Sequence, residues 1–197
     1  MAAQHGPAVL RLIDVLAAPS AEAGDGVSEL EAFFAAIEKR AYRMAYIATG
    51  DREEALDILQ DSMLRMVRKY RSSPTEAWRM LFYRILTNRI NDWHRRARIR
   101  SLLVFGGQHD DYVNHPADDR QQPLRLVENH ETIVWIERAL RQLSPRQQQV
   151  FLLRCWEGLD VNDTAQVLGC SPGSVKTHLF RALRILRDQT EALYEEK

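Results

Sequence analysis

Arginine and asparagine side chains recur at helical spacing in the middle of this chain. At i, i+4, i+7, i+11 and i+14 stand Arg84, Asn88, Asn91, Arg95 and Arg98, an order that places all five on one face of a helix. Guanidinium groups bind phosphates, whereas amide groups and aromatic rings read or stack on unpaired bases. Solvated arginine-rich helices usually alternate the sign of their charges, but residues 78–100 contain a single acid. The row therefore predicts a contact with nucleic acid.

A second basic face lies close to the C-terminus. One side of a helix after residue 171 would carry Thr177, Arg181 and Arg184, with Lys176 and His178 on its flanks. The opposite side forms an apolar stripe made of Val175, Leu179, Ala182, Leu183 and Leu186. A helix with this pattern packs by one side and presents cations on the other.

Capping residues divide residues 160–187 into two helices with a short break. Asp160 is a suitable N-cap, with Asp163 at the capping-box position, and Gly169 supplies the left-handed residue that ends the first helix. Ser171 caps the second helix, and Pro172 stands at its first position. The arrangement predicts a helix-turn-helix whose second helix enters a DNA major groove. A helical hairpin with a solvated basic face is the alternative.

Acidic and amide residues form a third polar face, over residues 57–68. Its polar members are Asp57, Gln60, Asp61, Arg65 and Arg68. The other face of the same helix is apolar and includes Leu59, Met63 and Met66. From spacing alone, a solvated surface is favoured here over a partner contact.

The elements that must position these faces are all predicted to be helices. Residues 28–48 form one helix with Ser28 as N-cap, Asp51 and Glu54 open the next as a capping box, and residues 70–77 form a loop. Helical periodicity returns near residue 129, and Ser144 with Gln147 forms another capping box; Cys155 is expected in the core. We therefore predict an all-α protein with two small helical domains, at 28–100 and 130–197. A flexible extension (1–27) precedes them, and a flexible acidic linker (101–129) joins them.

Composition excludes several classes of function. Lys plus Arg equals Asp plus Glu, 27 each, so the net charge is zero, whereas a free-standing DNA-binding protein is usually basic. Two cysteines fit a reduced cytoplasmic protein, and no apolar run reaches membrane-spanning length. The spacing of His109, Asp110, His115 and Asp118 fits no compact metal site. With no paired carboxylates, nucleophile elbow or glycine-rich phosphate loop, we expect neither an enzyme nor a cofactor.

Three stretches together resemble bacterial sigma factors of the sigma-70 family, in particular the extracytoplasmic-function (ECF) group. Residues 143–154, 157–159 and 173–182 are similar to the fourth conserved region of that family. Residues 57–63 look like its region that clamps a coiled coil of core RNA polymerase. Residues 82–88 look like the helix that melts and reads the −10 promoter element. The likeness covers about residues 29–98 and 130–190.

The resemblance implies three contact surfaces. Core RNA polymerase would be bound by Asp57, Gln60, Asp61 and Arg65. The melted non-template strand of the −10 element would be bound by Tyr70, Ser72, Trp78, Arg84, Asn88, Asn91, Arg95 and Arg98, with a flipped base held between the 70–77 loop and Asn88. The double-stranded −35 element would be bound by Ser174, Lys176, Thr177, His178, Phe180, Arg181 and Arg184. Whether an anti-sigma factor is a further partner stays open.

Three features depart from the family pattern. Asp163, Thr164 and Ala165 replace the usual acidic–aliphatic–alanine triplet of the first helix. His178 stands where arginine is common, and the loop after Tyr70 lacks an aromatic residue at its middle. All three leave the promoter sequence open. The alternative function is a helix-turn-helix regulator that acts independently of core polymerase, but such a regulator has no need for the basic row at 78–98.

Overall fold

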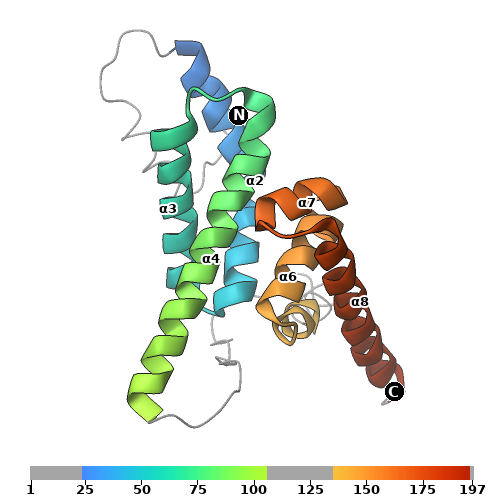
Figure 1. The fold of residues 1–197 in the computed structure, drawn as a ribbon. Coiled ribbons are helices and arrows are strands. Elements are labelled where there is room, and N and C mark those ends of the chain that lie inside the picture. The colour runs from blue at the N-terminus through green and yellow to red at the C-terminus, as the bar shows by residue number, and fades with distance from the viewer. Residues whose placement is uncertain (1–23, 106–134, 196–197) are drawn as a thin grey trace, which may run out of the picture. The chain divides into compact units, whose positions relative to one another are not determined.

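The computed structural model describes residues 24–105 and 135–195, and every regular element within these two ranges is helical (Figure 1). The predicted all-α fold is confirmed for these ranges. The N-terminal extension up to residue 23, and the acidic linker from residue 106 with its histidines and aspartates, lie outside the described residues. The chain divides into two compact units, with the boundary between Trp93 and His94. Each unit is described by itself.

Three helices build the first unit: α2 (Gly24–Thr49), α3 (Arg52–Tyr70) and the first part of α4 (Thr75–Phe105). They lie side by side in Figure 1 around a core that includes an aromatic cluster. Phe34 of α2 and Phe82 of α4 are both fully buried, with ring centroids 6.2 Å apart. Phe33 packs its ring against Phe82 edge to face, at 83° and 6.1 Å. The apolar stripes predicted for these helices therefore meet in one core.

The junction between α2 and α3 is held by side-chain caps. Asp51 is the N-cap of α3, as predicted, and its Oδ1 accepts from the backbone N–H groups of Glu53 (2.8 Å) and Glu54 (3.0 Å). The capping box predicted with Glu54 is wrong, because the Asp51 N–H donates to Oγ1 of Thr49 at 3.2 Å and not to the Glu54 side chain. The Ser28 N-cap is also wrong, since α2 begins at Gly24. Residues 24–27 thus belong to a helix and not to an extension.

Helix α4 runs beyond the predicted start of the linker. Residues 101–105 continue it, so the linker boundary at residue 101 is wrong. The apolar residues Leu102 to Phe105 carry no breaker, and the first glycine follows at Gly106. The Ser101 hydroxyl donates to the carbonyl oxygen of Arg98 at 2.8 Å, which satisfies this serine within the helix.

The second unit contains a helical stretch at 135–141, α6 (Pro145–Phe151), η1 (Leu152–Trp156), α7 (Val161–Leu168) and α8 (Pro172–Glu195). The predicted capping box at Ser144 is confirmed, with the Ser144 N–H donating to Oε1 of Gln147 at 3.0 Å. Both α6 and α7 pack against α8. Leu140, Val150 and Val175 lie in the core that these helices share.

A π-helical turn corrects the prediction for Cys155. In η1 the Glu157 N–H donates to the Leu152 carbonyl oxygen at 2.9 Å, five residues back instead of four. The wider turn rotates the following positions, so that Leu152 and Leu153 are buried while Cys155 is exposed. Cys155 is therefore not a core residue. Gly158 then ends the element with φ at 67°. None of the helices that the structure describes is long and apolar enough to cross a membrane.

Candidate nucleic-acid interfaces

The first part of the basic row, Arg84, Asn88 and Asn91, lies on the side of α4 opposite the core, whereas Arg95 and Arg98 follow Trp93, the last buried residue described in this helix. Arg84, Asn88, Arg95 and Arg98 are exposed, and Asn91 is half-buried. Phe82, Leu86 and Ile90 fill the core from the same helix. A cationic strip backed by rigid packing can hold an extended phosphate chain without reordering the helix.

Trp78 does not belong to this strip. Only 4% of its surface is exposed, its ring packs against Phe33 at a centroid distance of 5.7 Å, and its Nε1–H donates to the Ser73 carbonyl oxygen at 2.9 Å. The prediction that Trp78 contacts DNA is wrong, because no face of the indole is available for stacking. It instead anchors the turn between α3 and α4, where Ser72 is exposed and Tyr70 is half-buried.

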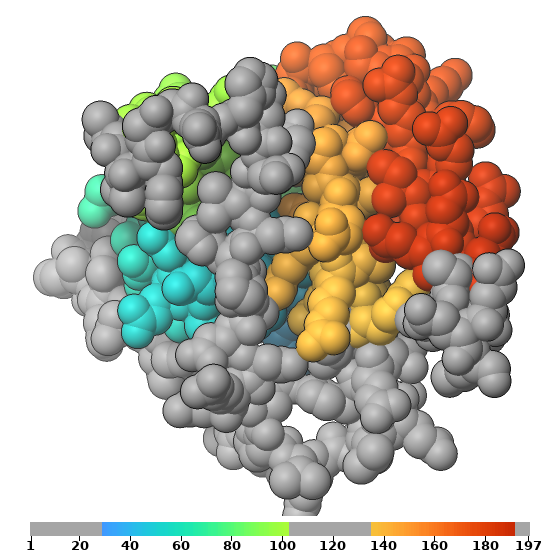
Figure 2. Space-filling model, turned by 90° about the horizontal axis from the view of Figure 1, so that it is seen from below, coloured from blue at the N-terminus to red at the C-terminus, as the bar shows by residue number. Residues whose placement is uncertain are grey.

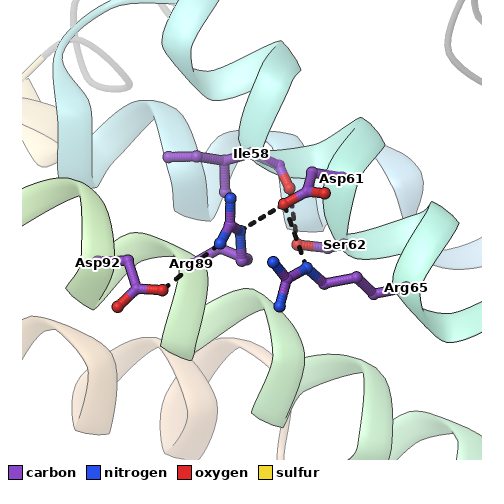
Figure 3. Close-up of polar contacts among 6 residues, drawn as sticks. All are labelled: Ile58, Asp61, Ser62, Arg65, Arg89 and Asp92. Atoms are coloured by element: carbon purple, nitrogen blue, oxygen red, sulfur yellow. Dashed lines mark hydrogen bonds and ion pairs between the residues drawn. The ribbon is translucent and has the colours of Figure 1, made fainter. Parts of the chain in front are cut away.

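The polar face of α3 holds the four residues predicted to bind a protein partner. Asp57 is exposed and Gln60 is half-buried. The side chains of Asp61 and Arg65 are 38% and 47% exposed, and Arg65 Nε lies 3.4 Å from Asp61 Oδ2. The same Oδ2 atom also contacts Arg89 of α4, a residue that the sequence did not single out (Figure 3).

The helix-turn-helix forms with the predicted caps. Asp160 Oδ1 accepts from the Asp163 N–H at 2.7 Å, Gly169 adopts φ 62° and ψ 42°, and Ser171 Oγ accepts from the Ser174 N–H at 3.1 Å. Arg146 of α6 makes a further hydrogen bond that the sequence pattern does not indicate. Its guanidinium donates to the carbonyl oxygen of Leu168 at 3.3 Å and so connects α6 with the end of α7.

Side chains of α8 form a broad exposed surface, red in Figure 2. Its exposed members at the predicted DNA-contacting positions are Lys176, Thr177, Phe180, Arg181 and Arg184, while Ser174 and His178 are half-buried. The Thr177 hydroxyl donates to the Gly173 carbonyl oxygen at 3.0 Å, a bond that orders this side chain on the surface. Leu183 is 46% exposed, so its predicted place in the apolar stripe is wrong. The packed stripe is narrower, with Val175 and Ala182 fully buried.

His178 is surrounded by cations. Desolvation lowers the pKa of His178 below its ordinary value, and Arg146 and Arg181 lower it further. The imidazole is therefore neutral at pH 7 and offers a hydrogen bond instead of a charge. This distinguishes it from the arginines on the same surface.

The lowered pKa of His178 predicts acid sensitivity of the second unit. Because the folded pKa lies below the unfolded value of about 6.5, the unfolded state binds more protons, and stability falls as pH drops through 6.5 toward the folded pKa. His178→Gln should reduce this loss between pH 7.5 and 5.5, measured by urea unfolding. Thr177→Ala, an exposed neutral neighbour, is the control. Equal pH dependence in the parent and in His178→Gln would contradict the prediction.

Comparison with known proteins assigns both units. The family model described as sigma-70 region 2 matches residues 30–99, and the model described as sigma-70, region 4, matches residues 133–186. Together the two models match more than half of the chain. The basic row of α4 and the polar face of α3 fall in the first match, and the helix-turn-helix falls in the second.

Individual relatives agree with the family models. The chain is 29% identical to the ECF RNA polymerase sigma factor SigX of Bacillus subtilis over 160 residues, which are 79% of this chain and 80% of that protein. It is 30% identical to the ECF sigma factor SigE of Mycolicibacterium smegmatis over 153 residues, 76% of this chain and 56% of the relative. The fold is shared with the sigma factor RpoE of Bartonella quintana, solved in complex with the anti-sigma factor NepR: the TM-score is 0.58 and the identity 23%, over 82% of this chain and 96% of that one. The chain therefore belongs to the sigma-70 family, as an ECF-type alternative sigma factor that works with core RNA polymerase to direct promoter-specific transcription.

Proposed function

We propose that this sigma factor divides its work among three surfaces. The polar face of α3 binds core RNA polymerase through Asp57, Gln60, Asp61 and Arg65. The turn after α3 and the basic row of α4 bind the melted −10 strand through Tyr70, Ser72, Arg84, Asn88, Asn91, Arg95 and Arg98. The exposed surface of α8 binds the −35 element through Ser174, Lys176, Thr177, His178, Phe180, Arg181 and Arg184.

One observation carries the proposal: the predicted rows lie on helices whose opposite faces are buried, and α4 is buried in this way as far as Trp93. Phe82 and Ile90 fix α4, Leu59 and Met63 fix α3, and Val175 anchors α8. A side chain on such a rigid element loses less freedom on binding than one on a loop. Separate basic and acidic faces also explain how a chain with zero net charge binds both DNA and polymerase.

On the −10 element, the geometry supports capture of an unpaired base next to Asn88. An amide both donates and accepts, so Asn88 can pair with the edge of a base that has left the stack. Unstacking costs a few kcal/mol, and stacking with pocket hydrogen bonds returns a similar amount, about 1–3 kcal/mol per base. Arg95 and Arg98 then hold the phosphates of the opened strand.

On the −35 element, α8 acts as a recognition helix in the major groove. Arg181 and Arg184 are exposed and can each form a bidentate contact with guanine, which discriminates between bases by about 1–3 kcal/mol. Phe180 is 64% exposed, so its ring is available to pack on a thymine methyl group. The neutral imidazole of His178 offers a hydrogen bond to the edge of a base. Whether the imidazole donates or accepts in that bond sets part of the base preference.

The proposal extends to regulation and location. The relative from Bartonella quintana forms a complex with an anti-sigma factor, and we propose an anti-sigma partner here too. The protein acts in the cytoplasm, where core polymerase and promoters are found. It contributes binding and strand opening, without catalysis of its own.

Asp57→Lys tests the polymerase surface. Asp57 is exposed and makes no ion pair within the part of the chain that the structure describes, so the substitution reverses a surface charge without disturbing packing. We expect the affinity for core polymerase to fall at least about tenfold, or ~1.4 kcal/mol, since a reversed charge at an interface is repelled. Asp61→Arg would be a less suitable test of this surface, because the new arginine would face both Arg65 and Arg89.

The experiment combines binding with transcription. Purified protein is titrated with fluorescently labelled core polymerase, and transcripts from a promoter library are then sequenced. Glu29→Lys makes the same charge change on an exposed position of α2 and should behave as the parent. Unchanged core affinity in Asp57→Lys would contradict the surface assignment. Tight DNA binding without promoter-specific initiation would favour an independent helix-turn-helix regulator.

A further inference from the structure

Arg89 of α4 lies between two carboxylates that come from different helices (Figure 3). Its Nε is 2.5 Å from Oδ2 of Asp61 on α3, and its Nη1 is 3.4 Å from Oδ2 of Asp92, one turn further along α4. The side chain of Arg89 is only 19% exposed. A guanidinium that is shielded and paired twice is held in one orientation.

The contact with α3 is buried even though Asp61 lies at the surface. Asp61 Oδ2 and Arg89 Nε are both inaccessible to water, whereas the Asp61 side chain as a whole is 38% exposed. Asp61 therefore turns one oxygen into the junction between α3 and α4 and the rest of its carboxylate outward. Beside it, the fully buried Ser62 donates to the Ile58 carbonyl oxygen at 2.6 Å, and Nε of Arg65 lies 3.4 Å from the same Oδ2 atom of Asp61.

Arg89 follows directly after the asparagine proposed to hold the flipped base. Successive residues in a helix are rotated by about 100°. Accordingly, Asn88 is exposed, Arg89 meets α3, and Ile90 enters the core. The rotation of α4 about its own axis at this turn, and hence the direction of Asn88, is therefore constrained by Arg89 in addition to the core contacts of Ile90.

We propose that Arg89 is a positioning residue for recognition of the −10 strand. Clamped by Asp61 and Asp92, it fixes the rotation of α4 beneath Asn88, and the same clamp leaves the outward part of Asp61 available to polymerase. The proposal rests on the proposed function of α3 and α4. It explains why this arginine stands outside the phosphate-binding row: two carboxylates already offset its charge.

The clamp needs the shape of arginine and not only its charge. Arg89 Nη1 donates to Oδ2 of Asp92 while Nε of the same planar guanidinium lies against Oδ2 of Asp61 as an ion pair, whereas a lysine ammonium is a single point charge. Arg89→Lys is therefore expected to read the −10 strand almost as poorly as Arg89→Met. Arg68→Met is the matched control, because Arg68 is exposed on α3 and lies outside the clamp.

The test measures base discrimination by the holoenzyme. The probe is a single-stranded oligonucleotide with the −10 sequence recovered from the promoter library, and a second one carries a mismatch at the flipped base. With saturating core polymerase, Arg89→Met should reduce the ratio of the two affinities by roughly three- to thirtyfold. Arg68→Met should keep the parent ratio. Thermal unfolding is followed in parallel, because a purely structural role would lower the melting temperature without changing the ratio.

Each outcome distinguishes a failure of the positioning role of Arg89 from a failure of the proposed function of the −10 surface. If Asn88→Ala lowers the ratio and Arg89→Met does not, the positioning role is wrong and the proposed function stands. If Asn88→Ala itself leaves the ratio unchanged, the proposed reading surface is wrong. A parent-like ratio in Arg89→Lys would also overturn the clamp, since charge alone would then suffice.

Discussion

Replacing Arg84, Arg95 and Arg98 together by alanine is expected to abolish promoter opening while leaving recruitment to the −35 element largely intact. These residues form the exposed cationic strip of α4, and none of them lies in the core. Each phosphate contact on single-stranded DNA contributes about 0.7 to the slope of log affinity against log salt concentration. The triple variant should therefore lose about 2 from that slope, besides its loss of affinity for the −10 strand.

The measurement is holoenzyme binding to a −10 single strand over a series of salt concentrations, together with permanganate footprinting of opened promoters. The control removes the same charge elsewhere: Lys39, Arg52 and Lys69 are exposed and lie outside the proposed surfaces, and their triple alanine variant should keep the parent slope. If the Arg84, Arg95 and Arg98 variant and the control variant lost affinity equally, the cationic strip would attract DNA only through long-range electrostatics, which would contradict direct phosphate contacts. Equal loss of closed and open complexes would lead to the same conclusion.

Phe82→Ala is expected to lower the free energy of unfolding of the first unit by about 3–5 kcal/mol. Phe82 is fully buried and contacts the rings of Phe33, Phe34 and Tyr83. Its removal loses both apolar burial and three edge-on ring contacts. Because domains are stable by only about 5–15 kcal/mol, this change removes much of the margin that holds α2 against α4.

Phe180→Ala provides a control with the same chemical change. Phe180 is 64% exposed on α8, so its removal should alter the free energy of unfolding by no more than about 0.5 kcal/mol. Urea unfolding followed by circular dichroism compares the two variants. Similar costs for both would contradict the packing of the first unit. Phe180→Ala should instead reduce initiation from promoters that depend on the −35 element, measured by transcription in vitro.

Helix ends and polar rows could be predicted from the sequence because their causes are local. A capping side chain bonds to a backbone group two or three residues away, as Asp51, Gln147 and Asp160 do. The periodicity of α4 likewise depends only on helix geometry, so its exposed arginines and buried aromatics followed directly. Even so, the Asp51 capping box was wrong, since a nearby Thr49 hydroxyl took the N–H that the pattern assigned to Glu54.

Roles that depend on a neighbouring helix could not be predicted in this way. Trp78 has the right residue type and spacing for stacking on DNA, but Phe33 of α2 covers it. Cys155 was expected in the core, and a π-helical turn rotates it outward. Leu183 continues an apolar stripe, but the packed strip on α8 is narrower than that stripe.

The sequence by itself determined the α-helices, most of their caps and the three polar rows, because these follow from hydrogen bonds and periodicities within a few residues. The tertiary structure alone decided which members of each row remain available to a partner. Arg89 is the clearest case: in the sequence it is one more arginine of a basic helix. Only when α3 packs against α4 does Asp61 come within 2.5 Å and make that arginine a link between two surfaces. Charge pairing across helices depends on distances that no spacing along the chain encodes.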